Sequence, residues 1–191
     1  MILDVALAAS MALSDQSGAV ASLTHAEFET FYRETARPLW AYLARLCGDR
    51  ALADDLLQES YLRFCRARLP AVRGEWKAYL YRIGTNLAAD WWRQTGRRVV
   101  VASVSEIGDA ADRPDAELAA VRRHELDRAL ATLKPRDRAL LWLAYVEGSD
   151  HREIAKTLGL SRASVKVLLF RARRKLAEVL EKRGIGSEVL P

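Results

Sequence analysis

The chain has 191 residues, of which 50% are hydrophobic and 29% are charged, and this composition suits one or two small globular domains. Its net charge of +5 is a moderate basic excess, so the location of the charge is more informative than its sum. No apolar run approaches the length of a membrane span, which excludes an integral membrane protein.

Residues 1–22 are predicted to be a loosely ordered tail. They lack the basic start of a signal peptide, and Asp4 interrupts their apolar stretch. The sequence leaves open whether translation begins at Met1 or at Met11.

A first helical domain is predicted over residues 23–98. Thr24 and Glu27 form a capping box that opens the first helix, Pro38 suits the first turn of a separate second helix, and Asp49 is the N-cap of a third. The four predicted helices cover residues 23–35, 38–48, 49–68 and 75–93, with a loop over 69–74.

The composition then changes. Residues 99–118 carry five acidic residues and one basic residue, contain Gly, Pro and Ser, and show no helical period, which indicates a flexible acidic linker. Helices resume over residues 119–132 and 135–145 in a second domain, 119–183, followed by a tail, 184–191. Because no alternating strand pattern is present, the predicted fold class is all-α, with two small helical domains joined by the linker.

A helix-turn-helix is predicted at the end of the second domain. Asp150 and Glu153 form a capping box, Gly159 suits a left-handed turn, and Ser161 can cap the helix that follows. Two short helices joined by such a turn are the outline of a DNA-binding helix-turn-helix.

The last predicted helix has an unusual outward face. An apolar stripe at helical spacing predicts the buried side: Val165, Leu168, Leu169, Ala172, Leu176 and Val179. Residues 162–175 contain six basic residues and no acidic one, and Val167 and Phe170 stand among them on the other side. Cations suit phosphates and guanine edges, and apolar groups suit thymine methyls, so this face predicts DNA binding; the alternative is an amphipathic basic helix with no such role.

The helix predicted over 75–93 also combines aromatic and basic side chains. Its core stripe leaves Tyr81, Arg82 and Trp92 on the opposite side, with Asn86 at its edge. Residues 63–98 carry nine basic and two acidic residues. This pattern favours a platform on which unpaired bases stack, and the alternative is a protein–protein seam that buries the two rings.

The helix predicted over 49–68 presents a different surface. Asp54, Asp55 and Gln58 lie on its outer side with Leu62, and an outward leucine among acids favours a protein partner with a basic counterpart; the alternative is an ordinary solvated face. Asp54 and Asp55, with Glu59, lack a second polar cluster or a phosphate-binding glycine loop, so an enzyme with catalytic residues is not predicted.

Metal binding is not predicted either. Cys47 and Cys65 fit no metal spacing and follow apolar helical positions, which indicates buried reduced thiols and a cytoplasmic protein. His25, His124 and His151 stand far apart and pair with no cysteine motif. We therefore expect no metal, no cofactor and no small-molecule substrate.

Three ordered motifs resemble the extracytoplasmic-function (ECF) sigma factors of bacterial RNA polymerase, over roughly residues 28–183. Residues 54–63 (DDLLQESYLR) resemble the family's core-polymerase-binding helix, and 76–93 (WKAYLYRIGTNLAADWWR) its −10 recognition and melting helix. Residues 133–138 (LKPRDR), 145–148 (YVEG) and 153–155 (EIA) resemble the opening of its −35-binding domain, whose recognition helix would include 165–166 and 170–173.

The resemblance implies a subunit that performs no chemistry, binds core RNA polymerase and promoter DNA, and has an anti-sigma factor as partner. It implies that the acidic linker threads the polymerase cleft. It assigns core binding to Asp54, Asp55, Gln58 and Leu62, and −10 binding to Tyr81, Arg82, Asn86, Trp92 and Arg93. It assigns −35 binding to Arg162, Ser164, Lys166, Val167, Phe170, Arg171 and Arg174.

Two other classes compete with this interpretation. A conventional helix-turn-helix regulator would bind DNA without polymerase, and it predicts a dimerisation or ligand domain where this chain has a basic, aromatic half. A purely protein-binding helical adaptor would leave the six-cation helix unexplained. The sequence does not identify the inducing signal, the promoter or the regulon.

Overall fold

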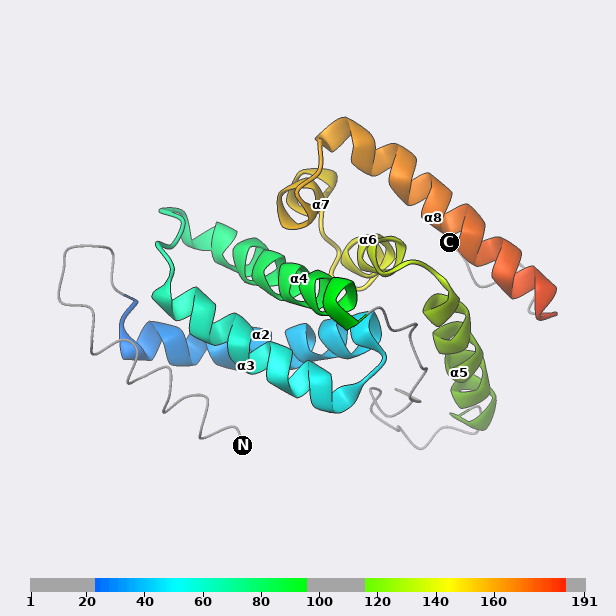
Figure 1. Cartoon of the computed structure of the whole chain (residues 1–191), viewed down its shortest axis with the longest axis horizontal. Helices are drawn as coiled ribbons and strands as arrows, with labels where there is room; N and C mark the ends of the chain where they lie inside the picture. Colours follow the sequence, from blue (N-terminus) through cyan, green and yellow to red (C-terminus); the bar gives the residue numbers. More distant parts are fainter. Residues whose placement is uncertain (1–22, 96–115, 185–191) are drawn as a thin grey trace.

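A computed structural model describes residues 23–95 and 116–184, and every regular element in these two ranges is helical (Figure 1). The predicted all-α class is confirmed. The predicted tail over 1–22 and the linker over 99–115 lie outside the described residues. The elements are α2 (His25–Cys47), α3 (Arg50–Arg66), the 3-10 turn η1 (Arg73–Glu75), α4 (Trp76–Thr95), α5 (Ala116–Thr132), α6 (Pro135–Tyr145), α7 (His151–Leu158) and α8 (Arg162–Lys182).

The prediction of two helices on either side of Pro38 is wrong, because α2 is one continuous helix that contains this proline. Proline removes the hydrogen bond to the carbonyl four residues earlier, here that of Glu34. Glu34 is exposed, so water can reach that carbonyl. The buried stripe also runs through both halves, from Phe28 and Phe31 to Leu39 and Tyr42, and packing therefore favours continuity.

Helices α2, α3 and α4 pack against one another as a three-helix bundle around a common aromatic and aliphatic core. The rings of Phe31 and Phe64 stack at 5.0 Å, and Trp76 meets both edge-on. Gly84 lets α4 approach its neighbours, because a Cβ there would lie 3.2 Å from Ser60 Oγ on α3. These contacts fix one side of α4 and determine which residues face away from the core.

The first helix of the C-terminal group begins earlier than predicted. Helix α5 starts at Ala116, so residues 116–118, assigned to the linker from composition, are helical. Helix α6 covers Pro135–Tyr145 as predicted, with Pro135 in its first turn. No helix within the described ranges is long and apolar enough to cross a membrane.

The helix-turn-helix is confirmed, and local chemistry explains its bounds. Asp150 accepts hydrogen bonds from the backbone N–H groups of Arg152 and Glu153, and the Glu153 carboxylate accepts from the N–H of Asp150. Gly159 ends α7 in the left-handed region at φ 63°. Ser161 then caps α8 by accepting from the N–H of Ser164.

The two groups of helices pack against each other. Helix α7 lies on α4, and α6 lies against the C-terminal part of α2 (Figure 1). Arg45 on α2 pairs with the buried Asp127 on α5, and its guanidinium lies over the Trp142 ring at 5.5 Å. This arrangement brings the predicted DNA-binding residues of α4 next to the helix-turn-helix.

Candidate nucleic-acid interface

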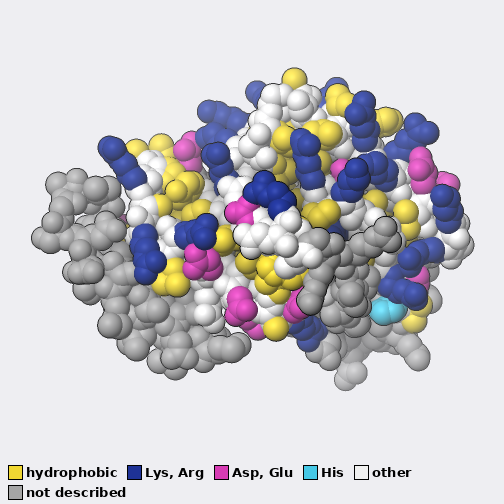
Figure 2. Space-filling view, viewed as in Figure 1, with side chains coloured by type: hydrophobic (Ala, Val, Ile, Leu, Met, Phe, Trp, Pro, Cys, Tyr) yellow, Lys and Arg dark blue, Asp and Glu magenta, His cyan; other side chains and the backbone are white. Residues whose placement is uncertain are grey.

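The outward face of α8 has the apolar and basic character predicted for it. Its inner stripe is buried through Val165, Leu169 and Ala172. Val167 and Phe170 are 50% and 58% exposed, although both are apolar and large. Lys and Arg side chains interspersed with hydrophobic ones crowd the edge of the molecule that α8 forms (Figure 2).

The cations of α8 fall into two groups. Lys166 and Arg171 are exposed, and neither forms an ion pair with a carboxylate among the described residues. Arg174 pairs with Glu178 at 3.1 Å within the helix, and Lys175 Nζ lies 2.6 Å from the buried carboxylate of Asp137 on α6. Lys166 and Arg171 are therefore available to a ligand, whereas Arg174 and Lys175 already have carboxylate partners.

Two further predicted residues lie at the start of α8. Arg162 is exposed in its first turn. The Ser164 hydroxyl is half-buried and lies 2.7 Å from the Ser161 hydroxyl, so it is engaged at the N-cap. Ser164 thus contributes to the start of the helix as well as lying beside the outward face.

The predicted −10 residues of α4 are only partly accessible. Arg82, Asn86 and Arg93 are exposed. Tyr81 is 2% exposed, so its predicted exposure is wrong in this arrangement. Trp92 is half-buried, and its indole N–H has no hydrogen-bond partner among the described residues.

Residues of the C-terminal helices contribute to the burial of Tyr81 and Trp92, and the Tyr81 ring also packs against that of Tyr42 on α2 at 5.2 Å. Leu143 of α6, Glu147 of the following loop and Thr157 of α7 line the same small cavity as Tyr81. The Arg138 guanidinium lies 5.9 Å from the Trp92 ring centroid. Burial and the nearby Glu147 carboxylate both raise the pKa of Tyr81, so its hydroxyl stays neutral.

Two ion pairs join α4 and the 3-10 turn before it to α7 and to the loop before α7. Lys77 Nζ lies 2.9 Å from Glu147 Oε2, and Lys156 pairs with Glu75 at the start of α4. Helical periodicity within one segment could not reveal these residues, because each finds its partner in the other half of the chain. The one sequence signal for these pairs was the excess of basic residues over 63–98, because it indicates that cations in this segment bind an anionic partner.

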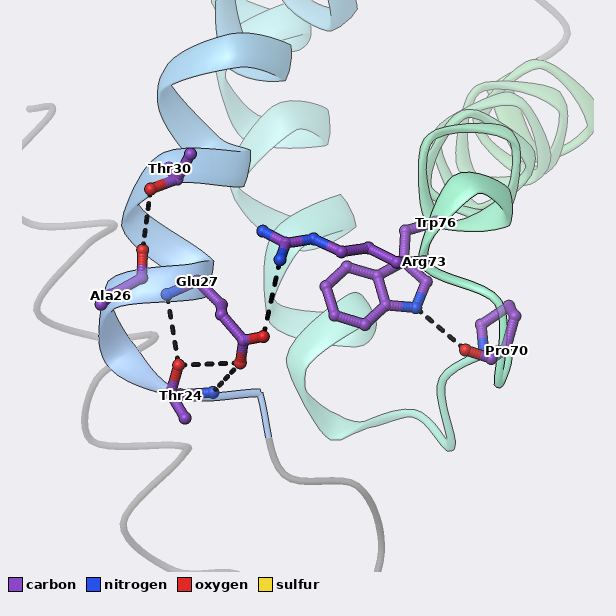
Figure 3. A network of polar contacts seen from close by, with 7 residues as sticks. All are labelled: Thr24, Ala26, Glu27, Thr30, Pro70, Arg73 and Trp76. Atoms are coloured by element: carbon purple, nitrogen blue, oxygen red, sulfur yellow. Dashed lines mark hydrogen bonds and ion pairs between the residues drawn. The ribbon is translucent and has the colours of Figure 1, made fainter.

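The loop before α4 is held by contacts of Arg73 and Trp76 (Figure 3). Arg73 lies over the Trp76 ring at 5.4 Å and reaches Glu27 at 3.6 Å, and the Trp76 indole N–H donates to the Pro70 carbonyl at 2.9 Å. Val72 stands 62% exposed at the tip. The loop is therefore held against α2 while it presents an apolar side chain beside α4.

The predicted core-binding residues share one face of α3. Asp55 is exposed, and Gln58 and Leu62 are half-buried. Asp54 is also half-buried and accepts a hydrogen bond of 2.8 Å from the Trp40 indole N–H on α2. Asp54 is thus partly engaged in holding α3 against α2, and Asp55 is the free acidic group of this face.

The cysteines are buried, as predicted. Cys47 and Cys65 are free thiols, and burial raises their pKa to about 12 and about 11, so both stay protonated at neutral pH. In the described ranges, no three His, Cys, Asp or Glu residues gather in a way that could hold a metal ion.

Comparison with known proteins identifies the family. The family model Sigma-70 region 2 matches residues 31–98, and the model Sigma-70, region 4 matches residues 123–176. The ECF RNA polymerase sigma factor SigL of Mycobacterium tuberculosis is 34% identical over 174 residues, which cover 88% of this chain and 97% of that protein. The chain belongs to the ECF sigma factors.

A second relative agrees with this assignment, and two solved structures share the fold. The sigma-E factor of Streptomyces avermitilis is 31% identical, with 86% of this chain and 90% of that protein covered. The sigma factor RpoE of Bartonella quintana, solved in complex with the anti-sigma factor NepR, superposes with a TM-score of 0.61 at 23% identity over 81% of this chain and 97% of that one. CnrH, solved with the cytosolic domain of CnrY, superposes at 0.58 and 23% identity over 93% and 97%.

This ECF sigma factor is thus a subunit that directs RNA polymerase to promoters, and its partners are core RNA polymerase and promoter DNA. Sigma factors as a family are not enzymes. The family assignment favours this function over a conventional helix-turn-helix regulator, because that regulator would not carry a region 2 domain ahead of its helix-turn-helix.

Proposed function

We propose that this ECF sigma factor divides initiation among three surfaces. The face of α3 around Asp55 and Leu62 binds core polymerase, the outer side of α4 engages the unwound −10 strand, and the outward face of α8 reads the −35 duplex. Region 2 would span residues 23–98 and region 4 residues 119–183, and the family-model matches support this division.

The observation that carries the proposal is the pair of apolar side chains exposed on α8. Water solvates Phe170 and Val167 poorly, and a purely solvated basic face would not need them. Between Lys166 and Arg171 they match the chemistry of a major groove, in which thymine methyls lie beside guanine acceptors. On α4, Trp92 is half-buried in this arrangement, and beside the exposed Arg82, Asn86 and Arg93 it would supply a ring for stacking.

An anti-sigma partner and a cytoplasmic site of action complete the proposal. The RpoE structure holds an anti-sigma factor, and this chain shares its fold, which supports a similar partner here. The sigma factor would act where RNA polymerase transcribes, and it would contribute binding and positioning rather than chemistry of its own.

The decisive experiment separates two steps with two variants in reconstituted holoenzyme. Trp92→Ala should leave core binding unchanged and reduce open-complex formation at a target promoter, measured by permanganate reactivity, because stacking is worth about 1–3 kcal/mol per base. Asp55→Lys should weaken core binding, measured by fluorescence titration. Gln94→Ala, an exposed neighbour on α4, and Glu29→Lys, an exposed acid on α2, are the matched controls.

Normal permanganate reactivity in the Trp92 variant would mean that Trp92 on α4 takes no part in melting the −10 element. Unchanged affinity of the Asp55 variant for core polymerase would mean that this face of α3 does not bind core polymerase. Each result leaves the other assignment intact, since the two variants act on different steps.

A further inference from the structure

Two neighbouring cations of α8 have carboxylate partners of different kinds. Arg174 pairs with Glu178 of the same helix at 3.1 Å, and both side chains are more than half exposed. Lys175 reaches across to α6, where its Nζ lies 2.6 Å from Oδ2 of Asp137, whose side chain is 11% exposed. The first pair lies on the surface of one helix, whereas the second joins two helices.

The two pairs would respond differently to a DNA phosphate. Because water screens both charges of an exposed pair, Arg174 and Glu178 attract each other weakly, and a phosphate can replace Glu178. A phosphate that took Lys175 would leave the carboxylate of Asp137 buried without its cation, which is strongly unfavourable. Lys175 is therefore retained by the protein, whereas Arg174 can turn to DNA.

The position of Lys175 on the helix agrees with this difference. At 3.6 residues per turn, it lies roughly 110° around α8 from the middle of the outward face. It borders the buried stripe, beside Ala172 and Leu176. From there its ammonium group meets Asp137 in the first turn of α6, and the N-terminus of a helix favours a negative charge.

The ion pair adds a directional contact to packing that is otherwise apolar. Helix α8 lies against α6 and α7 (Figure 1). Aliphatic side chains form its buried stripe: Val165, Leu169, Ala172, Leu176 and Leu180. Apolar burial has no preferred direction, so the stripe alone leaves small rotations of α8 possible. An ammonium group held by a carboxylate of α6 opposes such rotations, and it lies less than two turns from Phe170.

We propose that Lys175 and Asp137 are positioning residues that fix the rotation of α8 on α6 and do not touch DNA. This rotation determines which base edges Lys166 and Arg171 can reach. The inference rests on the −35 role proposed for the outward face of α8. It gives two adjacent cations different roles, because Arg174 would hold a phosphate and Lys175 would orient the helix.

The test uses the full-length chain and a duplex that the unaltered chain selects from a pool of random sequences. Anisotropy titrations with this duplex and with its single-base variants, at several salt concentrations, give the base discrimination and the salt slope. The protein variants are Lys175→Gln, Asp137→Asn, the two combined, and Lys175→Arg, which keeps the charge. Arg174→Gln removes the adjacent charge for contrast, and Lys182→Gln, exposed in the last turn of α8, is the matched control.

We expect Lys175→Gln to lower base discrimination by about tenfold, the equivalent of roughly one base contact, without changing the salt slope. Asp137→Asn should have the same effect, and Lys175→Arg should retain the discrimination. Arg174→Gln should instead lower the salt slope by about one and leave base discrimination unchanged. Lys182→Gln should change neither quantity.

Thermal unfolding of the same variants tests the pair without DNA. Residues that act as a unit are not additive, so the double variant should melt no lower than the less stable single variant. The Lys175 side chain is 48% exposed, so Lys175→Gln keeps the test open if Asp137→Asn does not fold. Losses of melting temperature that add up in the double variant would overturn the pair.

The direction of the Asp137→Asn effect on affinity separates the two possible roles of Lys175. If Lys175 bound a phosphate in competition with Asp137, Asp137→Asn would raise the affinity for every duplex and steepen the salt slope. That result would overturn the proposal, and so would unchanged base discrimination in Lys175→Gln. An unaltered chain that selects no sequence would instead contradict the −35 role of α8 itself, so the two failures can be told apart.

Discussion

The outer faces of helices α4 and α8 carry similar side chains but differ in how far they are exposed to solvent. Each carries arginines and a large apolar side chain on its outer side, yet Trp92 of α4 is half-buried and Phe170 of α8 is exposed. The difference arises from neighbours rather than from the helices themselves, because α7 and the loop before it lie over α4 and nothing in the described part of the chain lies over the corresponding face of α8. Helical periodicity tells which side faces a helix's own core; it does not tell what another domain covers.

The largest expected effect distinguishes the inner side of α4 from the outer side of α8. Leu80→Ala removes a fully buried side chain of α4 and should cost about 2–5 kcal/mol of unfolding free energy, because it leaves a cavity. Phe170→Ala removes a larger side chain and should change stability by less than about 0.5 kcal/mol, because Phe170 is exposed. Urea unfolding followed by circular dichroism measures both, and comparable losses would mean that the face of α8 is packed rather than free.

The positions predicted correctly from sequence were those fixed by local chemistry. Asp150, Gly159 and Ser161 set the bounds of α7 and α8, because a cap needs only its own neighbours along the chain. Pro38 misled the prediction, because its local signal for a helix start was overridden by packing of the continuous stripe around it.

The site was predicted less completely than the fold. Lys166, Arg171 and Phe170 are exposed on the predicted face, because no other element in the described part of the chain covers that face of α8. The Tyr81 ring packs against that of Tyr42 on α2, and Glu147 and its neighbours, more than sixty residues further along the chain, complete its burial. No pattern within one helix encodes the contact with Glu147. To predict this contact, one would have to match the basic residues near α4 with acidic residues in the second half of the chain.

The next prediction sharpens the comparison within α8 itself. Lys166→Ala or Arg171→Ala should cost about 1–3 kcal/mol on the preferred −35 element and relax base choice, because unpaired cations can reach base edges. Arg174→Ala should weaken binding similarly for all sequences and lower the salt slope by about one, because Arg174 would hold a phosphate. Its present partner is Glu178, which a phosphate would replace.

Titration of single-base variants of the −35 element at two salt concentrations separates these roles. Lys182→Ala, an exposed cation in the last turn of α8, serves as the control and should change neither quantity appreciably. Uniform losses for Lys166 and Arg171 combined with altered base preference for Arg174 would invert the assignment of reading and positioning residues.

A smaller effect is expected at the start of α8. Ser161→Ala removes the acceptor of the Ser164 N–H and should cost about 1 kcal/mol of unfolding free energy. Ser161→Asp should retain most of the stability, because Asp is an equally good N-cap. Thermal unfolding of both variants gives the comparison, and an alanine variant as stable as the unaltered chain would show that packing alone fixes the first turn of α8.

The smallest expected effect compares the two capping boxes, one in each group of helices. Hydrogen bonds from the Thr24 side chain and backbone lower the pKa of Glu27 below its ordinary value of 4.5. The backbone N–H of Glu153, followed by that of Arg152, lowers the pKa of Asp150 below its ordinary value of 3.8. A lowered folded-state pKa means that the charged form stabilises the folded chain.

This stabilisation is complete above the ordinary pKa values and is lost as the pH falls through the lowered ones. Asp150→Asn keeps a cap acceptor but cannot titrate, so its melting temperature should fall less steeply than that of the unaltered chain between about pH 5 and about pH 2. Glu27→Gln should likewise reduce the fall of the melting temperature with pH, because it removes the titrating carboxylate of the α2 capping box. Glu181→Gln, exposed near the end of α8 and away from both capping boxes, is the control and should leave this pH dependence unchanged. An Asp150→Asn slope equal to that of the unaltered chain would mean that the α7 box stabilises the helix-turn-helix through geometry alone, without a contribution from charge.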